Sequence, residues 1–207
     1  MVLDPLQPLL EVKVSLQAPQ MVEGEVCIIF SKEELDRYAL PFQFSLVLKF
    51  LRQRPSLDTI RSFIRARWGL SKQPIVYSML KPRNVFVRMT IEEDFVKAFA
   101  RKSCEIDGFS YRPFHWTIDY HEELEPVRVL VWLKLLGLPP IFYHEDLLRN
   151  ITLPIGRFLK RDNSTRCATR TDGARVCVEM DVSKDLLKAL WIGTPHHPLS
   201  FLSRSGI

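Results

Sequence analysis

Hydrophobic and polar positions follow one another along this chain in short patterns that predict both β-strands and α-helices. Residues 1–24 show no sustained period and predict a mostly irregular lead-in, after which the β-branched run 25–30 predicts a short strand. Ser31 is a typical helix N-cap, and Glu34 three residues later completes a capping box. We therefore expect a short helix here, which Pro41 ends because proline does not fit a helix interior.

From residue 43 the pattern becomes regular and predicts a unit of strands and helices. Helical spacing of apolar residues predicts one helix after Ser56 and a second after Thr90. Pro113 interrupts the last strand and indicates a sheet edge or a strand end. The predicted strands cover residues 44–51, 74–80, 84–89 and 109–116. The order β-α-β-β-α-β is that of the ferredoxin-like arrangement, an antiparallel sheet with both helices on one face.

An acidic link at residues 119–125 separates this unit from a second, smaller one. Its pattern is β-α-β-β, and residues 183–193 after it fit either a short helix or a further strand. The predicted elements are a strand in 127–139, a helix over 144–156, a polar strand or turn over 157–166 and a strand over 174–182. The sequence thus predicts an α+β protein with a lead-in (1–42), a ferredoxin-like unit (43–120), a second α+β unit (126–193) and a C-terminal tail (194–207).

Composition narrows the class of protein without identifying a function. With 207 residues, 46% hydrophobic and 26% charged, the chain is neither disordered nor collagen-like. It contains no apolar run long enough for a membrane span, and its first residues do not resemble a secretory signal. We therefore expect a protein of the nucleus or cytoplasm, with no membrane partner. The four cysteines show no zinc-binding spacing, so we expect free thiols and no metal.

Several segments, taken in order, resemble the plant retrotransposon-derived domain of unknown function 4283. The strand SLVLKFL followed by RPSLDTIRSFIRARWG resembles the opening of that family, and VFVRM and IDGFSYRPFHWTID resemble its next sections. Its most specific stretch is similar to VRVLVWLKLLGLPPIFYHEDLLRNITLPIG, and ARVCVEMDV resembles its closing strand. The resemblance covers residues 25–185.

The resemblance implies a fold related to the RNA recognition motif and an origin in plant transposable elements of the LINE type or in related host genes. Members of the family usually carry a CCHC zinc knuckle after this domain, and the pair is taken to bind nucleic acid. Residues 186–207 contain no cysteine, so neither zinc nor knuckle-based binding can be carried over to this chain. We expect no cofactor.

Basic residues are concentrated in two segments of a chain whose net charge is +5. Residues 52–72 hold six basic residues and one acid, and residues 157–175 hold six basic residues and two acids. Clustered positive charge attracts phosphate with little sequence preference, although a solvated helix face and a polar hairpin would look the same. The candidate phosphate contacts in these segments are Arg61, Arg65, Arg157, Lys160, Arg161, Arg166 and Arg170.

The strand at 84–89 stands where an RNA recognition motif would stack bases on aromatic side chains. Its signature is only partly present, so Phe86 is the one candidate for stacking and core packing is the alternative. Arg88 on the same strand and Arg112, next to Tyr111, are further candidate contacts with nucleic acid. The sheet face would otherwise pack against the second unit.

Nothing in the sequence favours an enzyme. There is no phosphate-binding loop, no G-x-S-x-G and no H-E-x-x-H motif. The titratable residues His115, Asp119, His121 and Glu122 are interpreted as solvated. We therefore predict a non-enzymatic protein that binds single-stranded RNA or DNA weakly through its arginines and lysines. The alternative is a protein-interaction or self-association module that has lost nucleic-acid binding.

Overall fold

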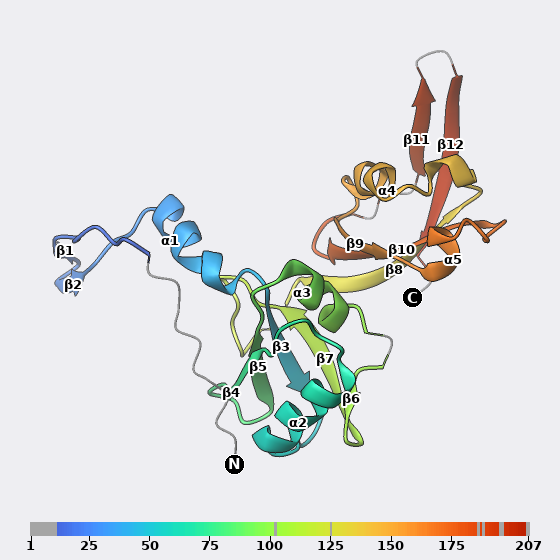
Figure 1. The fold of residues 1–207 in the computed structure, drawn as a ribbon. Helices are drawn as coiled ribbons and strands as arrows, with labels where there is room; N and C mark the ends of the chain where they lie inside the picture. The colour runs from blue at the N-terminus through green and yellow to red at the C-terminus, as the bar shows by residue number, and fades with distance from the viewer. Residues whose placement is uncertain are drawn as a thin grey trace. The chain divides into compact units, whose positions relative to one another are not determined.

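The computed structural model describes residues 12–101, 103–124, 126–185, 187, 189–194 and 197–205. The chain divides into two compact units, the first made of Met1–Phe95 and Cys104–Leu124 and the second of Val96–Ser103 and Glu125–Ile207. Each unit contains α-helices and an antiparallel sheet of five strands, so the protein is α+β (Figure 1). None of the described helices is long and apolar enough to cross a membrane.

The N-terminal part of the first unit begins with a small hairpin. Strands β1 (Gln20–Val22) and β2 (Glu25–Cys27) pair antiparallel around Glu23 and Gly24, which both have positive φ. The lead-in, expected to be mostly irregular, therefore contains one short strand, because Glu-Gly supplies a tight hairpin turn; residues 1–11 lie outside the described residues. Helix α1 (Lys32–Ala39) follows, with the predicted capping box of Ser31 and Glu34 confirmed, and a 3-10 turn over Leu40–Phe42 ends it.

The sheet of the first unit has the order β4-β5-β3-β7-β6. Its strands are β3 (Ser45–Phe50), β4 (Ile75–Ser78), β5 (Asn84–Arg88), β6 (Glu105–Ile106) and β7 (Phe109–His115). Helices α2 (Leu57–Arg67) and α3 (Glu92–Phe99) lie on the same side of it (Figure 1). Ser56 caps α2 by accepting a hydrogen bond from the Thr59 amide, as its sequence position predicts. Beyond Ser110, β7 is the edge of this sheet, and Pro113 lies there as expected.

The two faces of this sheet differ in what covers them. On the helix side, Phe95 of α3 is fully buried and its ring centroid lies 4.8 Å from that of His115. On the other side, which we call the open face, register aligns Tyr77, Phe86, Val47 and Phe114 in one row across four strands. The open face therefore presents aromatic side chains that the helices do not cover.

The second unit is built on a sheet of order β11-β12-β8-β10-β9. Its strands are β8 (Arg128–Leu136), β9 (Arg157–Arg161), β10 (Gly173–Asp181), β11 (Ala189–Thr194) and β12 (His197–Ser205). The connections contain a 3-10 turn (Pro140–Phe142), α4 (Glu145–Thr152) and α5 (Asn163–Arg166). Alternate residues of β8 and β10, such as Leu133 and Val176, join Leu148 of α4 in one buried core.

The C-terminal part differs from the expectation of a tail. Residues 189–194 form a strand, which resolves the two alternatives left for residues 183–193, and β12 then pairs with it. β12 also pairs with β8, with Ser203 opposite Leu135. The edge of β8 offers unpaired backbone N–H and C=O groups, and a strand that satisfies them is favoured over a free tail.

Candidate functional site

The second sheet carries an aromatic ring with two cations beside it on the face opposite its core. Register places Trp132 of β8, Cys177 of β10 and Lys160 of β9 in one row across three strands. The guanidinium carbon of Arg175 lies 4.9 Å from the centroid of the Trp132 ring, and the ammonium of Lys160 lies 5.8 Å from it. Both distances are within the range of cation–π attraction, which holds the two charges close together.

These side chains line a hollow of ≈ 600 Å³, which we call the Trp132 hollow. Its lining residues are Arg101, Leu130, Trp132, Lys160, Arg161, Asp162, Asn163, Ser164 and Arg175. Four of these nine side chains are basic and one is acidic. Lys160 also donates a hydrogen bond of 2.7 Å to the carbonyl oxygen of Ala100, so its position is fixed on two sides. The hollow therefore concentrates positive charge around a half-buried aromatic ring.

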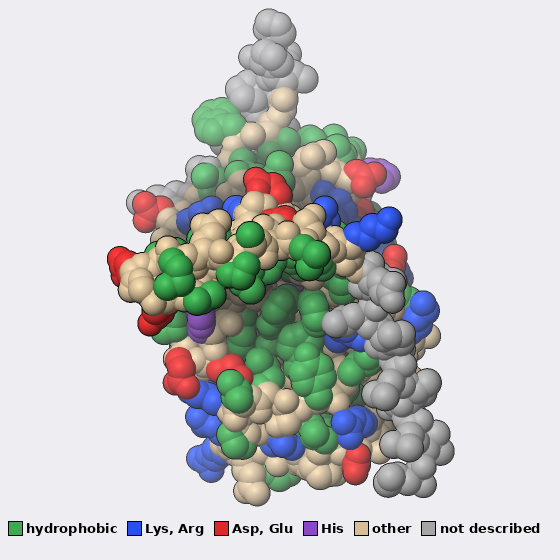
Figure 2. Space-filling view, turned by 90° about the vertical axis from the view of Figure 1, so that its left-hand side faces the viewer, with side chains coloured by type: hydrophobic (Ala, Val, Ile, Leu, Met, Phe, Trp, Pro, Cys, Tyr) green, Lys and Arg blue, Asp and Glu red, His purple; other side chains and the backbone are tan. Residues whose placement is uncertain are grey.

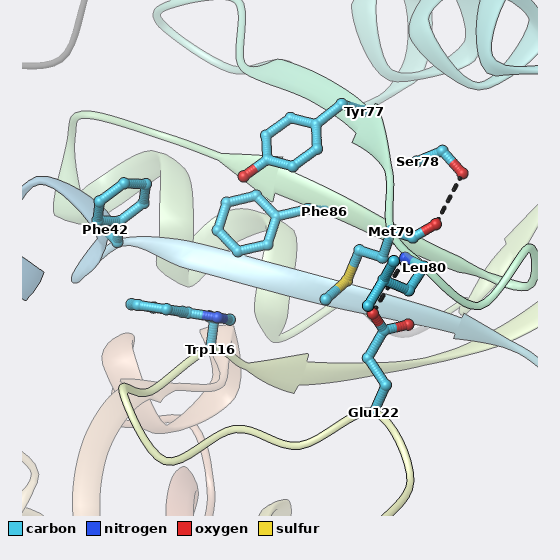
Figure 3. Close-up of a pocket in the computed structure, with 8 residues that line it drawn as sticks. All are labelled: Phe42, Tyr77, Ser78, Met79, Leu80, Phe86, Trp116 and Glu122. Carbon is cyan, nitrogen blue, oxygen red and sulfur yellow. Dashed lines mark hydrogen bonds between the residues drawn. The ribbon is translucent and has the colours of Figure 1, made fainter. Parts of the chain in front are cut away.

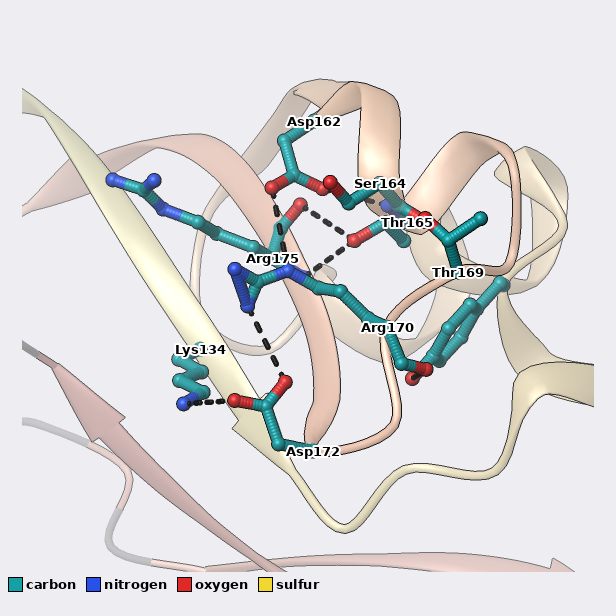
Figure 4. Close-up of polar contacts among 9 residues, drawn as sticks. Lys134, Asp162, Ser164, Thr165, Thr169, Arg170, Asp172 and Arg175 are labelled. Atoms are coloured by element: carbon teal, nitrogen blue, oxygen red, sulfur yellow. Dashed lines mark hydrogen bonds and ion pairs between the residues drawn. The ribbon is translucent and has the colours of Figure 1, made fainter.

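The loop beside the hollow is fixed by a polar network, drawn in Figure 4. Arg170 lies between two carboxylates, with its Nε 3.4 Å from Asp162 and another nitrogen 3.4 Å from Asp172. The Thr165 hydroxyl accepts a hydrogen bond of 2.8 Å from the amide of Arg175, which ties α5 to β10. Lys134 pairs with Asp172 at 2.6 Å. The network thus holds the loop that leads into β10 and Arg175.

Both carboxylates of this network stay ionised over a wide pH range. Hydrogen bonding to Lys134 is the largest influence on Asp172 and lowers its pKa. Burial acts to raise the pKa of Asp162, but hydrogen bonds from Thr165 and the charge of Arg170 outweigh it, so this pKa is also lowered. Arg170 therefore lies between two carboxylates that keep their negative charge to lower pH than a free aspartate does.

The residues that the sequence predicts for phosphate binding in this segment are placed differently from one another. Lys160 and Arg161 line the hollow, whereas Arg157 and Arg166 are exposed outside it and Arg170 is engaged by the carboxylates. Arg161 donates to the carbonyl oxygen of Tyr143, while its buried Nε has no hydrogen-bond partner among the described residues. A buried donor without a partner is expensive, so an acceptor entering the hollow would stabilise it.

Sequence reasoning did not select Trp132, Arg175 or Arg101 as site residues. Trp132 and Arg175 could have been found from the alternation of core-facing and outward-facing residues along β8 and β10. Leu133 and Val176 face the core, so their neighbours Trp132 and Arg175 face the other side of the sheet. Arg101 follows α3, and nothing in its local sequence connects it with residues about sixty positions later.

The thiol of Cys177 lies in the row between Trp132 and Lys160 and gives a test of how well this region is packed. It is fully buried, and burial raises its pKa to about 12, against the smaller lowering effect of Lys160 and Arg175. At pH 8 only about one thiol in ten thousand would be ionised, so both chemistry and access oppose reaction. Cys167 is free and exposed, so burial does not protect it from the reagent.

We expect Ellman's reagent at pH 8 to modify Cys167 rapidly and Cys177 only after the chain is unfolded. The measurement is the time course of absorbance for the wild type and for Cys167→Ser. The variant should lose the part of the fast reaction that comes from Cys167, whereas the partly exposed Cys27 and Cys104 still react, and it should keep the slow phase of Cys177. A Cys177 that reacts as fast as Cys167 in the folded protein would contradict the buried placement.

In the first unit, the predicted residues fall on opposite sides of the sheet. Arg61 and Arg65 belong to α2, where Arg61 pairs with Asp58 at 3.0 Å and donates to the carbonyl oxygen of Val76 at 2.8 Å. Phe86, Arg88 and Arg112 lie on the open face. The structure therefore does not bring the α2 arginines together with the strand residues.

Phe86 is buried, with 3% of its surface exposed, and is surrounded by aromatic rings (Figure 3). It stacks on Tyr77 with centroids 4.8 Å apart and an interplanar angle of 24°. Phe42 and Trp116 meet it edge to face. Tyr77 itself is 41% exposed, and partial burial raises its pKa. Tyr77 is thus the more exposed ring of this stacked pair, whereas Phe86 is buried beneath it.

These rings line a pocket of ≈ 470 Å³ on the open face, which we call the aromatic pocket. Its lining residues are Phe42, Tyr77, Ser78, Met79, Leu80, Phe86, Trp116 and Glu122. Figure 2, which looks from the side on which β4 lies in Figure 1, shows hydrophobic side chains gathered in a hollow of the surface. Glu122 is the charged residue of this lining. It is not simply solvated, as the sequence interpretation expects, because its carboxylate accepts three hydrogen bonds from other residues.

Within the part of the chain that the structure describes, no group of three or more His, Cys, Asp or Glu side chains is arranged to hold a metal ion. No protein-family model matches the chain, and no curated protein matches it either. The resemblance to the domain of unknown function 4283 therefore stays a prediction, and the case for a function depends on the geometry of the two sites.

Proposed function

We propose that this protein binds single-stranded nucleic acid without catalysing a reaction, and that the Trp132 hollow is its contact surface. The observation that carries the proposal is the pair of cations, Arg175 and Lys160, at 4.9 and 5.8 Å from the Trp132 ring centroid. Phosphates bind clustered cations and release counterions, while bases stack on aromatic rings and guanidinium planes. The hollow offers both kinds of contact within one depression.

The expected affinity is weak and sequence-tolerant. The charges of the hollow recognise the backbone, which every sequence shares, and a single half-buried ring gives at most one stacked base. Arg161 adds a buried donor, its Nε, which a phosphate oxygen would satisfy. Arg61 and Arg170 contribute little, because carboxylates or a backbone carbonyl already hold them.

We also infer that the first unit is ferredoxin-like and related to the RNA recognition motif. Its element order β3-α2-β4-β5-α3-β7 and its sheet order β4-β5-β3-β7 are those expected of that arrangement, with β6 added at the edge. An origin in a plant retroelement, and a place in the nucleus or cytoplasm, remain proposals that rest on the resemblance of the sequence.

Replacing Arg175 with glutamate is expected to lower the affinity for single-stranded RNA or DNA by about tenfold or more at low salt, because it reverses a charge at the centre of the hollow. The salt dependence should also weaken, by about 0.7 in the slope of log K against log salt for each phosphate that the variant no longer binds. The measurement is fluorescence anisotropy of labelled oligonucleotides at low and physiological salt.

The matched control is Lys184→Glu, which makes the same charge change at an exposed turn after β10 that does not line the hollow. It should lower affinity only slightly and leave the slope unchanged. Equal losses in the two variants would mean that overall charge, and not the hollow, determines binding. No binding by the wild type at low salt would overturn the proposal.

A second candidate is self-association or binding to another protein, favoured by exposed apolar residues in the N-terminal part. Seven large hydrophobic side chains between positions 21 and 40 are 38–69% exposed: Met21, Val22, Val26, Ile28, Ile29, Leu35 and Leu40. Exposed apolar groups in one short segment often mark an interaction surface. A concentration-dependent dimer in sedimentation velocity, without oligonucleotide binding, would favour this function over the first.

A further inference from the structure

The acidic segment 117–124 runs from β7 back to the turn between β4 and β5 and places a carboxylate there. One oxygen of Glu122 accepts a hydrogen bond of 3.1 Å from the amide of Leu80. The other accepts bonds of 2.9 Å from the amide of Lys81 and 2.8 Å from the side chain of Asn84. Figure 3 shows Glu122 directed at this turn. Three donors from a different part of the chain thus converge on one anion.

The donors belong to a turn that is built independently of Glu122. The amide of Asn84 donates to the carbonyl oxygen of Lys81 at 2.9 Å, and the amide of Met79 donates to the carbonyl oxygen of Asn84 at 3.2 Å, which closes the hairpin. Asn84 is 1% exposed, so its side-chain amide is held by packing and points at the anion. The Lys81 ammonium pairs with the neighbouring acid Glu123 at 2.6 Å. Converging N–H groups of this kind make a concave anion site, which suits phosphate as well as carboxylate.

The aromatic pocket lies directly beside this anion position, since Leu80 and Glu122 belong to both. Its volume of ≈ 470 Å³ is within the range of small-molecule sites, about 300–1,000 Å³. Its aromatic lining includes Tyr77, which is partly exposed, and Trp116. Such surfaces bind the flat face of a nucleobase.

We propose that the β4–β5 turn and the aromatic pocket form a binding site for a nucleoside phosphate, and that Glu122 occupies the phosphate position when no ligand is bound. The phosphate accepts hydrogen bonds from the amides of Leu80 and Lys81 and from the side chain of Asn84, and the base binds in the aromatic pocket. Ligand and Glu122 compete for the same donors, so binding releases segment 117–124 from the turn. This site does not depend on the Trp132 hollow, which belongs to the other unit.

The test is a titration of the full chain with 5′-AMP, with inorganic phosphate and with adenosine, followed by amide NMR and by tryptophan fluorescence. We expect 5′-AMP to shift the amide signals of Leu80 and Lys81. Glu122→Gln should bind 5′-AMP about tenfold more tightly than the wild type or better, because a neutral amide competes less well than a carboxylate for charge-assisted hydrogen bonds. Adenosine, which lacks phosphate, should bind weakly and equally to both proteins.

Asp119→Asn is the matched control, since it removes the same charge from an exposed residue of the same segment. It should bind 5′-AMP as the wild type does. Equal affinity of Glu122→Gln and Asp119→Asn would overturn the proposal and leave Glu122 as a tether of the segment. The same conclusion follows if 5′-AMP leaves the Leu80 and Lys81 signals unmoved.

Two further comparisons keep the result interpretable. If Glu122→Gln does not fold, Tyr77→Ala tests the base position instead, and 5′-AMP binding unaffected by that change would overturn the proposal. Oligonucleotides with and without a 5′-phosphate distinguish a free nucleotide from a strand end as the natural source of the ligand. Arg175→Glu should leave 5′-AMP binding unchanged, so this site and the Trp132 hollow can fail separately.

Discussion

Alanine at position 173 is expected to unfold the second unit or to lower its stability by more than about 3 kcal/mol, because both backbone strain and a backbone clash oppose it. Gly173 begins β10 with a φ of +121°, a conformation that residues with a Cβ rarely adopt. An added Cβ would lie 2.0 Å from the carbonyl oxygen of Leu135. That oxygen belongs to β8, which pairs with β10 along nine residue pairs, so it cannot move away without breaking the ladder.

The measurement is thermal and urea unfolding followed by circular dichroism, with Gly137→Ala as the control. Gly137 also has a positive φ, +72°, but an added Cβ there meets nothing within 4 Å. The stability of the control variant should therefore fall by only about 1 kcal/mol, the ordinary penalty for alanine at a positive φ. Similar losses in both variants would show that the close approach at Gly173 is not a constraint.

Alanine in place of Phe86 is expected to lower the stability of the first unit by about 3–5 kcal/mol, the usual effect of removing a buried phenylalanine. The side chain is 3% exposed and touches the rings of Tyr77, Phe42 and Trp116, so its removal leaves a cavity between them. This prediction separates the two interpretations of Phe86. A solvent-facing stacking residue would contribute little to stability, whereas a core residue contributes several kcal/mol.

Tyr77→Ala is the matched control, because Tyr77 stands opposite Phe86 on the neighbouring strand and is 41% exposed. The stability of this variant should fall by clearly less, about 1–2 kcal/mol, because the substitution removes less buried apolar area. If the free energy of unfolding of the two variants depends on urea concentration with the same slope, their urea midpoints give the difference in stability directly. If Phe86→Ala is the milder change, the open face is not packed as described.

Local sequence signals predicted most elements of the fold because they are set by residues close together in the chain. The hydroxyl of Ser31 and the carboxylate of Glu34 lie three residues apart, and so do the partners that start α2 at Ser56. Pro113 indicated an edge because its ring removes a backbone donor, whatever lies around it. The alternation of Val176, Val178 and Met180 indicated in the same way the face of β10 that joins the hydrophobic core.

What the sequence did not reveal depends on contacts between distant residues. The pairing of β12 with β8 joins residues about seventy positions apart, and no local period indicates it. In the sequence, Glu122 is one acid among several. Its hydrogen bonds come from donors thirty-eight or more residues earlier, so the local sequence does not indicate them. The Trp132 hollow likewise combines three strands with a residue that follows α3. For such sites the sequence supplied the charge but not the geometry.

The alternation along β8 has a consequence for how this protein can change. Leu133 and Leu135 are 3% exposed and hold the core, while Trp132 and Lys134 beside them are only half-buried on the other face. Substitutions at the even-numbered positions of this strand can therefore change the side chains of the hollow while the core residues stay as they are. One face of the strand can thus conserve the fold while the other face varies in chemistry.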